Sequence, residues 1–217
     1  MLRGVIFDLD GTLGDTLPVC YRAFARVFRR RLGVQYSDRQ IHAMFGPSEE
    51  GILARLCPRS ADEALAEYLA EYRHAHSACP RPFDGIPALL AGLRRRGIKL
   101  AIVTGKGPGS ARITLDIFGI GDHFSIIEAG SPSGGVKPAC MRRVLACWGF
   151  PPQAVAGVGD SPSDIRSGRE VGIQSVAAAW APGADPELLR AFGPDRLFAD
   201  VQSFRGWALA QEGDRQS

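Results

Sequence analysis

The sequence predicts an α/β protein: a Rossmann-like parallel sheet core with an inserted small all-α cap domain. Two observations carry this prediction. From residue 82 onward, short apolar runs alternate with helical stretches of about 10–15 residues, a pattern typical of a parallel sheet covered on both faces. Before that, one apolar run at residues 2–7 is followed by helical patterns alone. We therefore expect a core domain of residues 1–14 and 82–217 and a cap of residues 15–81.

The elements follow from local patterns. The run at residues 2–7 is apolar and short, as expected for a buried strand. Four helices should follow, because apolar residues recur at helical spacing between Gly and Pro breaks, and the segment Cys79 to Pro82 should link the cap back to the core. The predicted cap helices are one ending at Gly33, one starting at residues 37–38, one starting near residues 47–50, and one spanning residues 61–77.

Beyond the linker, the same reasoning gives five further strands and their connecting helices. The polar tail, residues 211–217, is expected to fray. The predicted strands are 99–103, 124–128, 154–158, 174–178 and 196–198, and the predicted helices are 85–96, 110–118, 138–148, 164–170 and one after the last strand.

Composition excludes several classes of function. Lys and Arg number 26 against 23 Asp and Glu, a balance that argues against a nucleic-acid or membrane-surface partner. No apolar run approaches the ~18 residues needed to span a bilayer, and Asp8 interrupts the first run, so we expect no signal peptide. The five cysteines are odd in number and form no CxxC pair, which favours reduced thiols in a cytoplasmic protein.

Polar residues follow three of the predicted strands and open one helix. Asp8 and Asp10 end the first strand, Thr104 and Gly105 end the 99–103 strand, and the GDSPSD run at residues 159–164 ends a third. Lys137 stands at the start of the 138–148 helix. Ligands of open parallel sheets bind at the carboxyl ends of the strands, so we expect these side chains to meet there.

The grouped residue types point to phosphoryl transfer. Two carboxylates one residue apart, such as Asp8 and Asp10, are tolerated when a cation lies between them or when one is protonated. Mg²⁺ binds through few carboxylates and also binds substrate phosphate. Thr104 and Lys137 are donors suited to phosphoryl oxygens, and a spare carboxylate can attack phosphorus to form an aspartyl-phosphate.

Four motifs resemble those of the haloacid dehalogenase superfamily, in its phosphoglycolate phosphatase-like branch with a helical cap. They are DLDGTLGD at residues 8–15, VT at 103–104, VKP at 136–138 and GDSPSD at 159–164, in the expected order along almost the whole chain.

The resemblance assigns roles to the matching residues. It implies that Asp8 is the nucleophile and that Asp10 protonates the leaving oxygen, later activates water, and ligates Mg²⁺ through its backbone carbonyl. Thr104, Gly105 and Lys137 would hold the transferring phosphoryl group. Asp8 and Asp160 would ligate the metal, while Asp164 would do so through water or would orient Lys137.

The implied function is a Mg²⁺-dependent phosphatase for a small phosphorylated metabolite, either phosphoglycolate-like or a sugar phosphate. A β-phosphoglucomutase-like phosphotransferase shares every core motif and stays open as an alternative, although Thr12 favours hydrolysis. A receiver-type phospho-aspartate switch fits less well, because its phosphorylated Asp ends a later strand. The expected partner is a small phosphate monoester, and the oligomeric state is open.

The sequence says less about the cap and about two departures from the family pattern. Gly14 replaces a larger apolar residue, which predicts a looser connection between core and cap, and Gly105 replaces an asparagine. His74 and His76 are expected to be solvated. The contacts of Glu49 and Glu50 with substrate stay open, but these acids suggest that the distal part of the substrate is no second strong anion. Trp180 either borders the site or packs in its own loop.

Overall fold

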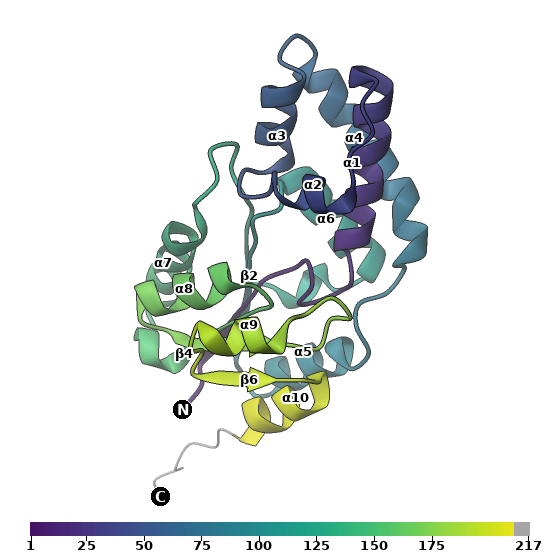
Figure 1. Ribbon diagram of the computed structural model, residues 1–217. Coiled ribbons are helices and arrows are strands. Elements are labelled where there is room, and N and C mark those ends of the chain that lie inside the picture. Colours follow the sequence, from purple (N-terminus) through teal and green to yellow (C-terminus); the bar gives the residue numbers. More distant parts are fainter. Residues whose placement is uncertain (211–217) are drawn as a thin grey trace, which may run out of the picture.

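A parallel sheet forms the centre of the computed structural model, which describes residues 1–210; the predicted frayed tail lies outside the described residues. Its order is β3-β2-β1-β4-β5-β6, and all pairings are parallel, which confirms the predicted fold class (Figure 1). The strands are β1 (Gly4–Phe7), β2 (Lys99–Val103), β3 (Ile126–Glu128), β4 (Val155–Gly159), β5 (Gln174–Ala178) and β6 (Arg196–Phe198).

The strand order reverses at β1, and the register there aligns three strand ends. Phe7, the last residue of β1, lies opposite Ile102 of β2 and Val158 of β4. The residues that follow these strands therefore leave the sheet at nearly the same level. In parallel sheets such a switch point is where the connections diverge and leave a crevice for ligands.

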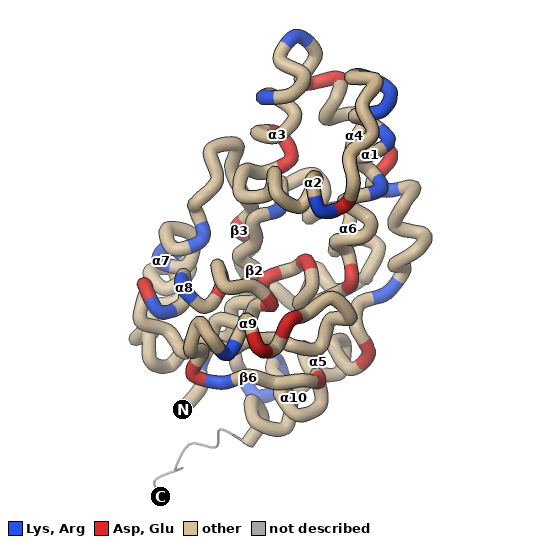
Figure 2. Tube along the Cα trace, viewed as in Figure 1, with Lys and Arg blue, Asp and Glu red and all other residues tan. Residues whose placement is uncertain are grey.

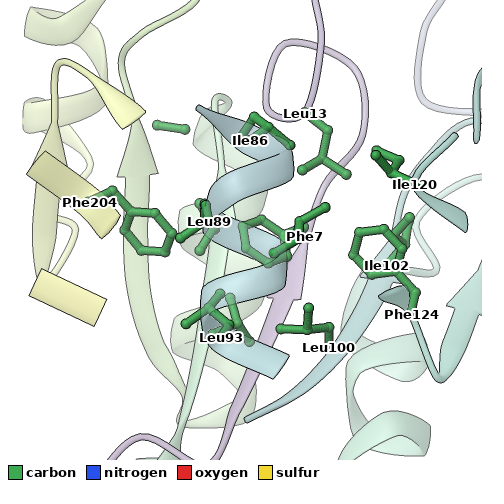
Figure 3. Packing of buried hydrophobic residues seen from close by; sticks show 14 of the residues in the cluster. Phe7, Leu13, Ile86, Leu89, Leu93, Leu100, Ile102, Ile120, Phe124 and Phe204 are labelled. Carbon is green, nitrogen blue, oxygen red and sulfur yellow. The ribbon is translucent and has the colours of Figure 1, made fainter. Parts of the chain in front are cut away.

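Helices cover both faces of the sheet, as the alternating pattern predicted. Helices α5, α6 and α10 pack on one face, where Phe7, Leu89 and Phe204 belong to one buried cluster (Figure 3). Helices α7 and α8 pack on the other, around Ile6, Met141 and Trp148. The bounds are α5 (Ile86–Arg95), α6 (Pro108–Phe118), α7 (Lys137–Trp148), α8 (Pro162–Val171), α9 (Pro186–Ala191), α10 (Val201–Ala210), with short 3-10 turns η2 (Gly121–His123) and η3 (Pro152–Ala154).

The cap segment lies over one end of the sheet (Figure 1). Its buried residues form a second hydrophobic cluster, which also includes Ile113 of α6. Phe24 and Phe28 stack within this cluster, next to Tyr68 and Tyr72. The predicted boundaries of the core and cap domains stay a prediction. The cap elements are α1 (Leu17–Leu32), α2 (Asp38–His42), α3 (Glu49–Leu56), α4 (Ala61–Ala75) and the 3-10 turn η1 (His76–Ala78).

The prediction of a solvated His76 was wrong. Helix α4 ends at Ala75 instead of residue 77, and the following 3-10 turn directs His76 onto α6. Its ring is 1% exposed, with Nε2 3.0 Å from Thr114 Oγ1 and Nδ1 2.7 Å from the Cys79 carbonyl oxygen. Burial lowers the pKa of His76. His74 is exposed, as predicted.

The expectation of a loose connection at Gly14 also fails. A Cβ atom at Gly14 would lie 2.5 Å from the Phe118 ring, so the backbone passes directly against that side chain. The chain that returns from the cap is also held at this point, because the Phe83 N–H donates to the Leu13 carbonyl at 2.9 Å. A glycine stands there because the ring fills the space that a side chain would need.

Two smaller differences concern segments with weak local signals. β3 begins at Ile126 instead of 124, and it has only three residues. Helix α9 (Pro186–Ala191) was not predicted, because six residues are too few to show a helical period. Asp185 caps it by accepting from the Leu188 N–H at 3.0 Å.

Phe204 tests the packing of α10 on the sheet. Its ring is fully buried and makes edge contacts with Phe7 at 6.2 Å. We expect Phe204→Ala to lower the free energy of unfolding by about 3–5 kcal/mol, because it removes a large buried ring and leaves a cavity. Leu188→Ala, at a position 46% exposed, should change it by less than about 0.5 kcal/mol. Denaturant unfolding measures both, and equal effects would contradict the packing described.

Candidate active site

The loop after β1 turns sharply, and one glycine makes the turn possible. Gly11 has φ +76°, and its N–H donates to the Gly14 carbonyl at 2.9 Å. A Cβ atom on Gly11 would lie 2.1 Å from an Asp160 carboxylate oxygen, so this position needs both a left-handed conformation and the absence of a side chain. The turn thereby brings the β1 and β4 loops into contact.

Asp8 is the buried carboxylate at the centre of the site. Its Oδ2 lies 3.0 Å from Lys137 Nζ, whereas Oδ1 is buried without a hydrogen-bond partner among the described residues. Burial raises the pKa of Asp8 to about 6, although the nearby Lys137 ammonium acts in the opposite direction. One oxygen is thus held and the other is free to react or to bind a cation.

Asp160 and Asp164 approach Asp8 from the loop after β4. Ser161 caps helix α8, and Asp164 completes the capping box by accepting from the Ser161 N–H through Oδ2 at 3.1 Å. The Asp164 Oδ1 accepts from Lys137 Nζ at 2.5 Å. Asp160 accepts from Thr12 Oγ1 at 3.0 Å. Burial, and then the charge of Asp8, raise the pKa of Asp160 well above its usual value. Lys137 therefore lies between two carboxylates, and Asp164 orients it.

These carboxylates fit a divalent cation. One oxygen from each of Asp8, Asp160 and Asp164 lies within 4.8 Å of the others. The partnerless oxygen of Asp8 and the raised pKa of Asp160 both indicate negative charge that Lys137 alone does not satisfy. Hard oxygen ligands in small number, beside a place for phosphate, suit Mg²⁺.

Asp10 belongs to a second group of charges, although it is only two residues from Asp8. Its Oδ1 accepts a hydrogen bond from Thr16 and lies 3.2 Å from Lys106 Nζ. The two aspartates of the first motif therefore face two different lysines. This separation relieves the repulsion that their spacing would cause.

Lys106 is the residue that the sequence analysis missed. Its ammonium is 4.2 Å from the Tyr72 ring centroid, 3.6 Å from a Glu49 oxygen, and within 3.1 Å of Cys20 Sγ. Burial alone would lower the pKa of Lys106, but Asp10 raises it well above its usual value. The available signal was the position of this lysine, directly after the strand-end pair Thr104 and Gly105.

Glu49 links the cap to the core. It begins α3, is 6% exposed, and accepts hydrogen bonds from the Gly107 N–H and from Ser110 at the start of α6. Tyr68 donates to it at 3.4 Å. A carboxylate at a helix N-terminus is favoured by the unpaired N–H groups there. Its neighbour Glu50 is half-buried, with one oxygen that has no partner among the described residues.

Thr104 and Gly105 lie on the floor of the same pocket as Asp8, Asp10, Lys137 and Asp160. Thr104 is buried, and its Oγ1 accepts from the Lys106 N–H at 3.2 Å. The cavity has a volume of about 680 Å³ and extends from this floor to the cap. It brings together five of the six polar residues predicted for the site, and Asp164 lies directly behind them.

Trp180 lies outside the pocket lining and packs on the β1 loop and on α10. Its indole N–H donates to the Thr12 carbonyl at 2.9 Å, and its ring packs against Phe204. It therefore braces the turn that carries Asp8 and Asp10. Neither position considered for Trp180, at the border of the pocket or within its own loop, is the one observed.

Comparisons with known proteins connect the chain to one family of hydrolases. The sequence model of the haloacid dehalogenase-like hydrolase family matches residues 5–178. Tyrosine-protein kinase PtkA of Mycobacterium tuberculosis is 36% identical over 82% of this chain, which spans only 62% of that relative's length. Phosphoglycolate phosphatase of Rhodospirillum rubrum is 29% identical over 95% of this chain and 91% of its own. Pyrophosphatase PpaX of Halalkalibacterium halodurans is 28% identical, over 92% and 94%.

Solved structures show the same fold. A haloacid dehalogenase-like family hydrolase from Streptococcus pneumoniae superimposes with a TM-score of 0.75 and 28% identity, covering 95% of this chain and 98% of its own. CbbY from Rhodobacter sphaeroides, solved in complex with phosphate, gives 0.76 at 20% identity, with coverage of 93% and 96%. At that identity the second likeness bears on the fold alone. No helix in residues 1–210 is both long and apolar enough to cross a bilayer.

Lys106 gives a test of the buried charge network. We expect Lys106→Met to lower the free energy of unfolding by about 3–5 kcal/mol, because Asp10 and Glu49 would be left as buried charges without their cation. Lys99→Met, at an exposed position, is the matched control and should change little. The double variant Lys106→Met with Glu49→Gln should recover part of the loss. Denaturant unfolding measures the free energy of unfolding of each variant. A Lys106→Met variant as stable as the natural sequence would refute the role assigned to Lys106.

Proposed function

We propose, because this chain belongs to the haloacid dehalogenase-like hydrolase family, that it is a magnesium-dependent phosphatase acting on small phosphate monoesters through an aspartyl-phosphate. One observation carries the proposal. Asp8 presents a buried carboxylate oxygen without a partner, beside Lys137, at the carboxyl end of the central strand.

In the first step, Asp8 Oδ1 would attack phosphorus and form an acyl-phosphate bond. The bond between phosphorus and the ester oxygen breaks, and Asp10 donates a proton to that leaving oxygen. Thr16 and Lys106 hold one oxygen of Asp10, which leaves its other oxygen for the proton. Thr104, Gly105 and Lys137 would hold the transferring phosphoryl group from the pocket floor.

In the second step, Asp10, now a carboxylate, would take a proton from water as that water attacks the phosphoryl group. The acyl-phosphate bond breaks, inorganic phosphate forms, and Asp8 returns as a carboxylate. Asp164 would keep Lys137 in place throughout, since the capping box of α8 holds its carboxylate and that carboxylate accepts from the Lys137 ammonium.

Asp8, Asp160 and the Asp10 backbone carbonyl would hold Mg²⁺, with Asp164 reaching it through water or acting only through Lys137. When bound, the ion neutralises negative charge on the phosphoryl oxygens and the surrounding carboxylates. The close grouping of the three carboxylates supports this assignment.

The alternative is a phosphotransferase that passes the phosphoryl group from Asp8 to a second hydroxyl compound, as a β-phosphoglucomutase does. It would use the same core residues. Thr12 favours hydrolysis, and here its hydroxyl donates to Asp160. Glucose 1-phosphate with glucose 1,6-bisphosphate separates the two functions, because a phosphatase releases phosphate and a mutase forms glucose 6-phosphate. A receiver-type switch has less support, since Asp8 ends the first strand.

Cytoplasmic location belongs to the same proposal. All five cysteines, which lie within the described residues, are free thiols, as is usual in a reducing compartment. The relatives carry different activities in their names, so the substrate is proposed only as a small phosphate monoester, phosphoglycolate-like or a sugar phosphate.

Metal removal should abolish turnover. We expect phosphate release from 4-nitrophenyl phosphate to stop in excess EDTA and to return on addition of Mg²⁺, because Asp8, Asp160 and the substrate phosphate repel one another without a cation. Release of 4-nitrophenol followed by absorbance measures this. Full activity after exhaustive chelation would refute the metal assignment.

Substitution of Asp8 and substitution of Asp10 should have different effects on turnover. Asp8→Asn should abolish turnover, because an amide cannot form the acyl phosphate. Asp10→Asn should slow turnover by ~10²–10⁴-fold and should accumulate phosphate on Asp8 with 4-nitrophenyl phosphate, whose leaving group departs without a proton. Acid quench followed by intact and peptide mass spectrometry detects the added phosphoryl group. Label on another residue, or turnover by Asp8→Asn, would show that the roles are assigned wrongly.

A further inference from the structure

The pocket is larger than the phosphoryl site requires. Its floor handles the phosphoryl group, but the cavity of about 680 Å³ continues upward to the cap and falls in the size range of pockets that enclose whole organic ligands. Whatever group is esterified to the phosphate must occupy this upper part. The cap residues that line it therefore decide which alcohols fit.

The cap wall of the pocket is apolar and partly aromatic. Phe45 lines this wall, stacked on Tyr21 at 5.9 Å between ring centroids and tilted against Phe24 at 6.2 Å. Phe24 and Phe45 both face the pocket, and Tyr21 supports the Phe45 ring from behind the lining. The apolar residues that line the cap side are Leu17, Phe24, Phe45, Pro47 and Ile52.

The lining offers little to a second anionic group. The Lys106 ammonium is already paired with Asp10 and Glu49, and Lys137 faces Asp8 and Asp164. Arg166 is exposed at the rim on α8, with its guanidinium over the Phe192 ring at 5.1 Å. A carboxylate or second phosphate in the upper pocket would thus be desolvated without a free buried cation among the described lining residues, which is costly.

We propose that the preferred substrates are phosphomonoesters of neutral, apolar alcohols carrying an aromatic ring, which packs against the Phe45 face of the cap. This inference rests on the proposed phosphatase function and replaces the phosphoglycolate-like and sugar-phosphate alternatives named there with one substrate class. Aromatic rings gain from burial and from offset or edge contacts with other rings. His42, hydrogen-bonded through Nδ1 to the Tyr21 hydroxyl at 2.9 Å, is an exposed polar cap residue that also lines the pocket.

The test compares esters whose leaving groups have similar reactivity. 2-Phenylethyl phosphate and ethyl phosphate are both alkyl esters. A difference in kcat/KM between them therefore reflects the presence of the ring and not the reactivity of the leaving group. We expect kcat/KM for 2-phenylethyl phosphate to be higher by about tenfold or more. Phosphoglycolate, which adds a carboxylate instead of a ring, should be no better than ethyl phosphate. A preference for ethyl phosphate or phosphoglycolate would overturn the inference.

A pair of variants assigns the effect to the cap wall. Phe45→Ala should reduce the kcat/KM ratio between 2-phenylethyl and ethyl phosphate several-fold. Phe150→Ala is the matched control, since Phe150 is also partly buried but packs on Trp148 outside the pocket, and the ratio should not change. Circular dichroism checks that both variants are folded. An unchanged ratio in a folded Phe45→Ala protein counts against the assignment.

Failure of the two proposals can be distinguished. If neither ester releases phosphate, the proposed function is wrong, whereas turnover without a preference for the ring leaves that function intact and removes only the inference. Binding gives a readout without turnover. Calorimetry on Asp8→Asn should show tighter binding of 2-phenylethyl phosphate than of ethyl phosphate, and equal affinities would contradict the aromatic subsite.

Discussion

The buried Lys106 ammonium is the interaction on which the arrangement of cap, core and site depends. It faces Asp10 from the core and Glu49 from the cap, and it lies over the Tyr72 ring of α4. Placing a cation away from water is costly unless its charge is matched. Here the match comes from both parts of the chain, so the cap helices and the strand-end loops are correctly placed only together. Figure 2 shows charged segments along the junction between the sheet and the cap.

This constraint explains how two aspartates one residue apart coexist. Asp8 faces Lys137 and the acidic cluster, while Asp10 faces Lys106 and Thr16. The turn at Gly11 sets the two directions apart, and Trp180 holds that turn through the Thr12 carbonyl. Each carboxylate therefore has its own electrostatic surroundings. That separation is what allows one to serve as nucleophile and the other as proton carrier in the proposed reaction.

The fold could be predicted largely from the sequence because its signals are local. Apolar runs such as Lys99–Val103 and Gln174–Ala178 show their boundaries directly, and the strand-end rule places Asp8, Thr104 and Asp160 at one edge. The residues whose positions or roles were not predicted depend on contacts between segments that are distant in the sequence. His76 is buried because α6 lies beneath it. The role of Lys106 depends on Asp10 of the β1 loop and on Glu49 of α3, two residues far from it in the sequence.

The contacts of Glu49 have a consequence for how substrate reaches the pocket floor. Cap and core are also joined where the Ser48 N–H donates to the Ser131 carbonyl at 2.9 Å. Any hinge motion that lifts α3 must break this bond and withdraw Glu49 from α6 and Lys106. Lys106 would keep Asp10 as its partner, and the floor would carry one negative charge fewer than in the closed arrangement. Opening thus weakens the repulsion that an entering phosphate dianion meets from the carboxylates around the floor, and closing restores the full set of acidic groups around the captured ester.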